Sequence, residues 1–228
     1  MQPISFKNSL FAIIFAIASL GGVAACSPHG QHQAESQTSP ATDTGAIPGM
    51  DHGNMDHSMA MDLGPADANY DLRFVDAMIP HHQGAIEMAK EAQQKSQRPE
   101  IKQLAEAIIK EQEREIGQLR QWRQAWYPQA GDRPMAYHPQ MGHMMEMSPE
   151  QTESMKMSQD LGAADGEFDL RLIDAMTPHH EGAVVMAEDA LSKSQRPEIK
   201  ELARNIIASQ QREIEQMKQW RQSWKITS

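Results

Sequence analysis

Cysteine is almost absent from this 228-residue sequence, which contains only Cys26. A single cysteine cannot form an internal disulfide, and it excludes metal sites built from several thiolates. Aromatic residues are also few, at 5% of the chain. Positive charge is scarce as well, with 21 Lys and Arg against 31 Asp and Glu. This balance argues against nucleic acid as a partner and mildly favours cations.

Long apolar runs are missing except near the N-terminus, where residues 1–25 are expected to form a secretory signal peptide. The stretch Val-Ala-Ala-Cys ending at Cys26 is similar to a bacterial lipobox, in which case Cys26 would carry a lipid anchor. Ordinary cleavage near Cys26 is the alternative. Both readings predict an exported protein, in the periplasm or as an outer-envelope lipoprotein, that contacts a membrane only through such an anchor.

Methionine, by contrast, is abundant, with 17 residues. Many lie beside histidines in two segments without apolar periodicity: an N-terminal tether, 26–66, which is expected to be disordered, and a linker, 127–165. Short His-rich tracts are typical of metal binding, so these segments are candidates for weaker, secondary metal sites. Their candidate ligands are Met50, His52, Met55, His57, Met59 and Met61 in the tether, and His138, Met141, His143, Met144, Met145 and Met147 in the linker.

The rest of the chain is an internal repeat. Residues 62–126 align with 160–224 without a gap, and 41 of the 65 positions are identical. The second copy begins 98 residues after the first. Such duplication predicts that both copies share one fold.

Each copy predicts a helical hairpin, over 67–126 and 166–228. Apolar residues recur every three or four positions, and the shared Lys-Ser-Gln-Arg-Pro segment interrupts the pattern. Because each helix has a narrow apolar stripe, the two hairpins are expected to pack as one all-α four-helix bundle. No segment is predicted to be a strand. A short helix is expected in the linker at about 149–160, because Ser148 and Gln151 match a capping box.

A Met-x-Pro-His-His motif stands in the first helix of each hairpin, and its proline is expected to kink the helix just before the histidines. Helical spacing places one set of donors on a common face in each copy. The predicted metal ligands are Met78, His81, His82 and Met88 in the first copy, and Met176, His179, His180 and Met186 in the second. Thioether and imidazole donors suit Cu(I), then Ag(I) and Cu(II).

The alternative is that these methionines only fill the core and these histidines only form buried hydrogen bonds. Duplication of the motif, the Met/His-rich segments and export favour metal binding. Because ligand imidazoles must be neutral, metal affinity is expected to fall as the pH drops through about 6.5.

Three further positions face the same predicted interior. Gln112 and Gln210 interrupt the apolar stripe of the second helix in each hairpin. A buried hydrogen bond that fixes the register of the bundle is the favoured role for them, and support of the ligand histidines is the alternative. Met217 stands where the first copy has Leu119, so it would add a sulfur to one half only.

The sequence resembles exported copper-binding proteins of the CopM type over both repeats. The matching residues are Phe168-Asp169, Met176, Pro178-His179-His180, Gly182-Ala183, Met186-Ala187, Gln210, Glu213-Ile214, Met217 and Trp220, with Tyr70-Asp71, Met78, Pro80-His81-His82, Gly84-Ala85, Met88, Gln112, Glu115-Ile116 and Trp122 in the first copy. The resemblance implies a four-helix bundle, copper binding, copper resistance and a location outside the cytoplasm. Leu119 departs from the pattern.

The residues and the resemblance together predict a non-enzymatic protein that sequesters or carries copper for copper resistance or homeostasis. Silver is a further candidate ion. A four-helix-bundle metalloenzyme is one alternative, although the repeats lack the Glu-x-x-His pairs of di-iron proteins. An envelope interaction module that needs no metal is the other. A copper exporter or oxidase could be the partner, and the sequence does not identify it.

Overall fold

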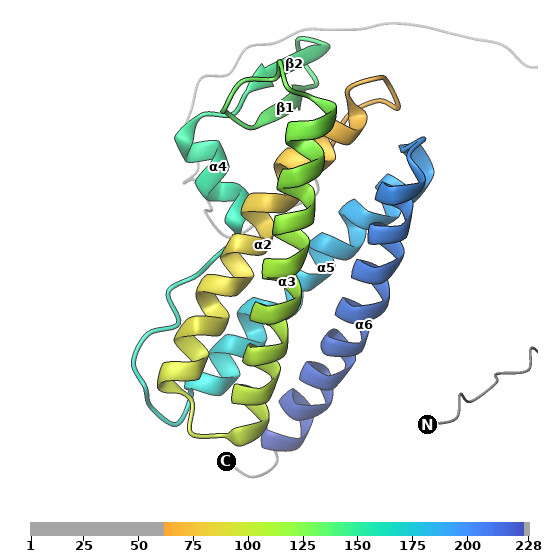
Figure 1. Cartoon of the computed structure of the whole chain (residues 1–228). Helices are drawn as coiled ribbons and strands as arrows, with labels where there is room; N and C mark the ends of the chain where they lie inside the picture. Colours follow the sequence, from red (N-terminus) through yellow and green to blue (C-terminus); the bar gives the residue numbers. More distant parts are fainter. Residues whose placement is uncertain (1–61, 226–228) are drawn as a thin grey trace, which may run out of the picture. The chain divides into compact units, whose positions relative to one another are not determined.

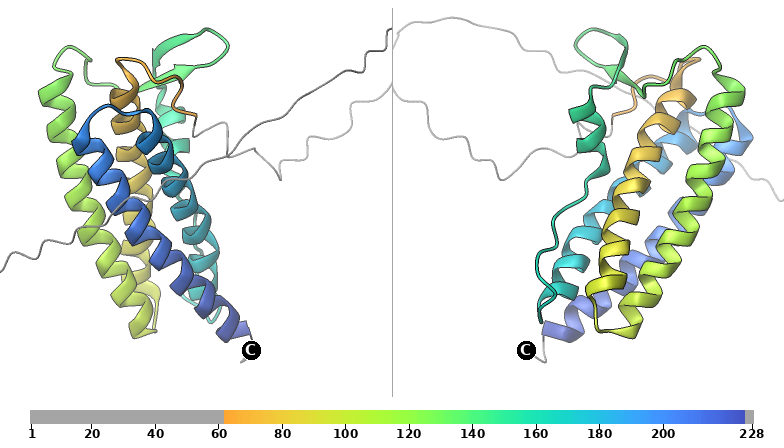
Figure 2. Two further views of the ribbon diagram at one scale, coloured as in Figure 1. Left: turned by 90° about the vertical axis from the view of Figure 1, so that its right-hand side faces the viewer. Right: turned by 60° about the vertical axis from the view of Figure 1, so that its left-hand side comes forward.

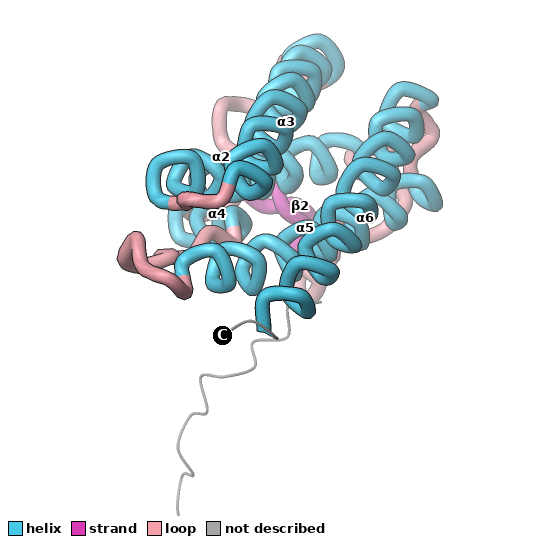
Figure 3. The backbone as a smooth tube through the Cα atoms, turned by 90° about the horizontal axis from the view of Figure 1, so that it is seen from below, coloured by secondary structure: helices cyan, strands magenta, loops and turns pink. Residues whose placement is uncertain are grey.

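The computed structural model describes residues 62–225. Four long helices dominate this part of the chain: α2 (Tyr70–Lys95), α3 (Pro99–Trp126), α5 (Phe168–Lys193) and α6 (Pro197–Lys225) (Figure 1). Helices α2 and α3 pack as one hairpin, α5 and α6 as the other, and α2 packs against α5. The predicted helical bundle of two duplicated hairpins is therefore confirmed, and Figure 3 shows its four helices from below.

Each hairpin turns at the same short segment of sequence. In the first, the Ser96 backbone N–H donates to the Ala92 carbonyl and the Arg98 N–H donates to the Ser96 hydroxyl oxygen. Ser194 and Arg196 repeat both bonds in the second. Pro99 and Pro197 then open the following helices, where their missing N–H costs nothing.

Reciprocal contacts join the two hairpins. The Arg98 guanidinium lies over the Trp224 ring at 4.0 Å, and Arg196 lies over Trp126 at 4.1 Å. Because Arg98 and Arg196 stand at the two hairpin turns, each turn is fastened to the far end of the other hairpin. The hairpins therefore pack antiparallel, and this arrangement brings the middle of α2 against the middle of α5.

The linker forms more structure than predicted. A two-stranded antiparallel hairpin, β1 (Met135–His138) and β2 (His143–Glu146), stands where no strand was expected. Its four-residue connection contains Gly142 with φ of +68°, a conformation that glycine adopts without strain. The prediction that this chain has no strand is therefore wrong, because turn chemistry within a Met-rich segment outweighed the lack of β-branched residues.

The short linker helix, α4, runs from Pro149 to Lys156 and ends four residues earlier than expected. Its capping box is confirmed: the Gln151 N–H donates to the Ser148 hydroxyl oxygen, and the Ser148 N–H donates to the Gln151 side-chain oxygen. Helix α4 packs on α2. The chain then runs along the bundle to the start of α5 (Figure 2).

No helix among residues 62–225 has a stretch apolar and long enough to cross a membrane. The expected signal peptide, Cys26 and the six candidate ligands of the tether, Met50 to Met61, lie outside the described residues.

Candidate metal centre

The two Pro-His-His motifs meet at the centre of the bundle. Pro80 and Pro178 are accommodated inside α2 and α5, which run unbroken through them. His81, His82, His179 and His180 are each no more than 1% exposed. The His81 and His179 rings lie 3.9 Å apart between centroids, at 47° to one another. The sequence left open whether each hairpin has its own histidine site, and the structure brings the two pairs together.

Two carboxylates outside the predicted ligand set hold the second histidine of each motif. His82 Nε2 lies 2.8 Å from Glu115 Oε2, and His180 Nε2 lies 2.7 Å from Glu213 Oε2. The Glu115 side chain is only 1% exposed. It shares a helix face with Gln112, three residues before it, and Leu119, four residues after it, and both of these are buried.

A backbone carbonyl holds a third histidine. His179 Nε2 lies 2.9 Å from the Lys156 carbonyl oxygen, at the C-terminal end of α4. The close approach of this carbonyl is possible because Gly84 has no side chain: a Cβ there would meet the Lys156 oxygen at 1.9 Å. The linker helix is thus part of the centre, which periodicity within the repeats could not indicate.

These bonds decide which ring nitrogen is free to bind a metal. A carbonyl or ionised carboxylate oxygen only accepts, so Nε2 of His82, His179 and His180 must be the protonated, donating nitrogen. When the ring is neutral, its Nδ1 atom then carries the lone pair. All three Nδ1 atoms, and both ring nitrogens of His81, are buried without a hydrogen-bond partner within 62–225.

Burial also keeps two of these rings neutral. Removal from water lowers the pKa of His81 well below its usual value, and the three neighbouring imidazoles lower it further. The pKa of His179 is lowered to about 3, mainly by removal from water and then by the neighbouring His180 imidazole. Both side chains are therefore uncharged at neutral pH, as metal ligands must be.

The predicted methionine ligands are all buried, and they belong to two separate hydrophobic clusters of the bundle core, called here the two methionine clusters. Met78 of α2 and Met186 of α5 belong to one cluster, and Met88, Met176 and Met217 belong to the other. Each cluster therefore draws sulfur atoms from both hairpins. The expectation that each copy's own methionines and histidines form one set on a helix face stays a prediction.

The two methionine clusters differ chemically. Met217 replaces Leu119 of the first copy, and its sulfur lies 4.0 Å from the Thr177 hydroxyl. The position equivalent to Thr177 is Ile79, so both members of this contact are apolar in the first copy. The extra sulfur predicted for the second copy is thus buried in the same cluster as Met88 and Met176.

Gln112 and Gln210 are buried as predicted, each 2% exposed, but within 62–225 their side-chain oxygens have no hydrogen-bond partner. The role in bundle register and the alternative role, support of His81 or His179, both remain predictions. The hydrogen-bond partners that the structure gives to the other histidines are Glu115, Glu213 and the Lys156 carbonyl.

The candidate ligands of the linker lie on or beside the β-hairpin. His138 and His143 are direct cross-strand neighbours, and Met144 pairs with Tyr137. Met141 in the turn is 55% exposed and Met145 is 41% exposed, so both can meet ions from solvent. Met147 is 4% exposed and lies in the interior, unlike the others.

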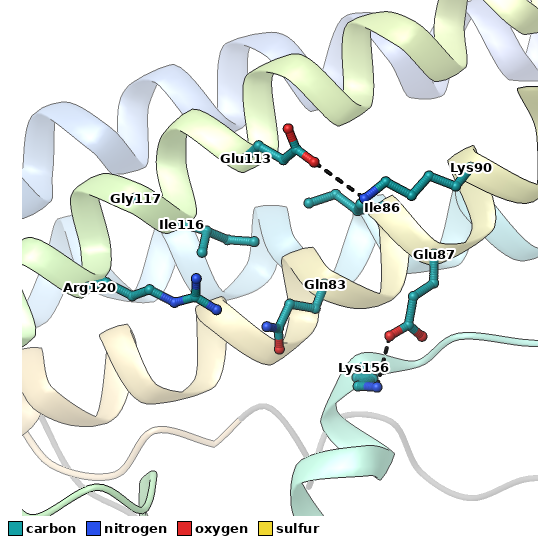
Figure 4. A pocket seen from close by; sticks show the side chains of 9 residues that line it. All are labelled: Gln83, Ile86, Glu87, Lys90, Glu113, Ile116, Gly117, Arg120 and Lys156. Carbon is teal, nitrogen blue, oxygen red and sulfur yellow. Dashed lines mark hydrogen bonds and ion pairs between the residues drawn. The ribbon is translucent and has the colours of Figure 1, made fainter.

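Among residues 62–225, no three His, Asp or Glu side chains are already arranged to hold a metal ion. An ion at the imidazole centre would therefore need sulfur donors or a small rotation of the rings. A more open groove, of about 470 Å³, lies on the outer surface between α2 and α3 (Figure 4). Its lining includes the ion pairs Lys90–Glu113 and Lys156–Glu87 but no histidine or methionine, so it does not offer soft ligands.

Comparison with known proteins places the chain in a family. The sequence profile of the family described as "Domain of unknown function (DUF305)" matches residues 71–221, more than half of the chain. The chain belongs to the DUF305 family. A DUF305 fragment from Deinococcus radiodurans shares 26% identity with it, covering 70% of this chain and 99% of the fragment with a TM-score of 0.55.

CopM is more similar to this chain in sequence than the Deinococcus radiodurans fragment is. The structure of CopM in the Cu(II)-bound form is 41% identical and covers 68% of this chain and 97% of CopM, with a TM-score of 0.54. CopM in the Cu(I)-bound form has a TM-score of 0.50, and CopM has also been determined with silver bound. The predicted resemblance is therefore confirmed. Separately, 49 residues are 41% identical to the uncharacterized protein L153 of Acanthamoeba polyphaga mimivirus, a match that spans 32% of that protein.

Proposed function

We propose that this protein binds copper outside the cytoplasm and sequesters or carries Cu(I) and Cu(II), with Ag(I) accepted by the same donors. One observation carries the proposal: five imidazole nitrogens of the two Pro-His-His motifs are buried without partners, and the predicted methionine ligands are buried in the two hydrophobic clusters of the same bundle. A buried polar atom without a hydrogen-bond partner lowers the free energy of unfolding by about 1–3 kcal/mol. Several such atoms in one place therefore indicate a ligand-binding role and not only packing.

The donor chemistry selects the ion. Thioethers are soft ligands and imidazoles are borderline ones, a combination that suits Cu(I) and Ag(I), while the imidazoles also serve Cu(II). The likeness to CopM, of which Cu(I), Cu(II) and silver forms are known, supports this choice. The ligands we assign are the Nδ1 atoms of His82, His179 and His180, either nitrogen of His81, and the sulfur atoms of Met78, Met88, Met176, Met186 and Met217.

The β-hairpin is proposed as a second, weaker site. His138 and His143 lie opposite one another, and the exposed Met141 stands in the turn between their strands. Such a site would exchange ions rapidly with solvent. Export, with Cys26 as a lipid attachment point, completes the proposal and is supported by the composition of residues 1–26.

Anaerobic Cu(I) titration of the purified chain tests the proposal. We expect binding tighter than about 1 μM, and a loss of at least about tenfold in the variant His81→Ala/His179→Ala. The control is Ile101→Ala/Ile199→Ala, which truncates two fully buried residues at equivalent positions without removing a metal donor. Equal affinity of the two variants, or no binding tighter than micromolar in the parent chain, would overturn the proposal.

A further inference from the structure

A narrow space lies between α3 and α6, beside the carboxylates that hold His82 and His180. Its empty volume is about 170 Å³, a figure that includes space open to solvent, and at no point is it wide enough for a water molecule. Ile108 lines it, together with three pairs of residues related by the 98-residue repeat: Glu111 and Ser209, Gln112 and Gln210, and Glu115 and Glu213.

Two buried amide oxygens line this space without partners. Gln112 and Gln210 occupy equivalent positions in the two copies, and each is 2% exposed. Their side-chain oxygens have no hydrogen-bond donor within the described chain. Water cannot supply one, because the space is too narrow.

Negative charge gathers around these amides. Glu111, Glu115 and Glu213 line the same space, and Glu115 and Glu213 each give one oxygen to a histidine. Arg114 stands at the outer edge, 3.9 Å from Glu111 and 3.4 Å from Glu115, with its side chain 57% exposed. The carboxylates alone are not arranged to hold an ion, so the two amide oxygens are needed to complete the set.

We infer that this space is a second cation site, built from oxygen donors, which takes a divalent ion through Gln112, Gln210 and Glu111. Carboxylate and amide oxygens favour harder ions than thioethers do, so its preference differs from that of the imidazole centre. Glu111 is the member that solvent reaches, with its side chain 35% exposed.

Mn(II) is the probe, because it prefers oxygen ligands and is a poor match for thioethers. Binding is followed through the loss of the electron paramagnetic resonance signal of free Mn(II) during titration of the full chain. We expect one ion per chain, and at least tenfold weaker binding in Gln112→Leu/Gln210→Leu. The control Gln121→Leu/Gln219→Leu changes equivalent, exposed glutamines on the same helices and should bind as the parent does.

A second variant guards against misfolding. Glu111→Gln changes a partly exposed side chain, so it should fold normally and still weaken Mn(II) binding severalfold. Ag(I) affinity should stay within twofold of the parent in all three variants. Equal Mn(II) binding in the buried and exposed glutamine variants, or no Mn(II) binding by the parent, would overturn this inference. Loss of Ag(I) binding by the parent, with Mn(II) binding retained, would instead overturn the proposed function.

Discussion

His81 and His179 face each other at the centre of the bundle with ring centroids 3.9 Å apart, yet their surroundings differ. His179 donates from Nε2 to the Lys156 carbonyl, whereas His81 has no hydrogen-bond partner among residues 62–225. The linker helix α4 thus breaks the equivalence of the two repeats at the point where they meet. His81 can reorient toward an ion without giving up a bond, and His179 cannot.

The carboxylate partners of His82 and His180 should control metal affinity. Changing Glu115 to Gln removes the charge that holds the His82 ring and fixes its tautomer, so Ag(I) affinity should fall by about 10–100-fold. Glu213→Gln should act in the same direction. The control is Glu113→Gln, whose side chain is 55% exposed and points to Lys90. Competition titration with an Ag(I) chelator measures all three, and equal affinities would show that the carboxylates do not support the ligands.

The two methionine clusters should differ in their affinity for soft ions, because only one contains Met217. Met217→Leu keeps the volume of the side chain and removes one sulfur, so it should cost less than about 1.5 kcal/mol of stability. It should weaken Cu(I) binding by roughly tenfold, or about 1.4 kcal/mol. The reciprocal change Leu119→Met should strengthen binding. Anaerobic Cu(I) titration compares them, and unchanged affinity in both variants would mean that the sulfur at position 217 is not a ligand.

Gly84 should be necessary for the docking of α4. A Cβ at this position would lie 1.9 Å from the Lys156 oxygen, and a backbone atom cannot move aside cheaply. Gly84→Ala should therefore lower the free energy of unfolding by about 1–3 kcal/mol and break the bond to His179. Gly117→Ala is the matched control, since nothing lies within 4 Å of its Cβ, and it should stabilise the helix by about 0.5–1 kcal/mol. Chemical denaturation measures both, and similar effects would contradict the contact.

The metal-free protein should lose stability in acid through its buried imidazoles. The pKa of His179 is about 3 in the folded chain and 6.5 in the unfolded one, and that of His81 is lowered in the same direction. Between these values the unfolded state binds more protons, so the stability present above pH 6.5 is lost as the pH falls. Each ring contributes at most about 1.4 kcal/mol per pH unit. His81→Ala/His179→Ala should show a shallower fall in urea denaturation, and an unchanged slope would refute the assignment.

The same shifts alter what the sequence predicts about metal binding and pH. An unperturbed histidine would lose metal affinity below about pH 6.5. Because the folded-state pKa values of His81 and His179 are lower, protons compete with the metal there only at more acidic pH. Affinity at the bundle should therefore persist between pH 6.5 and 5 as long as the chain stays folded, which Ag(I) titration at several pH values can measure.

Helical spacing and the gap-free repeat were sufficient to predict the hairpins. The 3.6-residue period of Leu72, Val75 and Met78, continued beyond the histidines, required a helix through Pro80, and that helix is present. Duplication predicted that both copies share one fold, but not the different surroundings of His81 and His179. Periodicity and duplication are local or repeated features, so a single sequence reveals them.

The contacts that the sequence did not reveal depend on tertiary packing. Glu115 looks like one more surface charge beside Arg114, and only the position of α2 shows that it is buried against His82. The Lys156 carbonyl carries no side-chain signal at all. The β-hairpin was missed because its residues lack the alternation of a half-buried strand. The hairpins were thus predictable from the sequence, and the hydrogen-bond partners of the histidines were not.

The most direct test is nuclear magnetic resonance of the chain with ¹⁵N-labelled histidine, titrated with Ag(I). We predict that the Nδ1 resonances of His82, His179 and His180 shift strongly, together with a nitrogen of His81, before those of His138 and His143 respond. Shifts confined to His138 and His143, with the four buried rings unchanged at one equivalent of Ag(I), would contradict a metal centre inside the bundle.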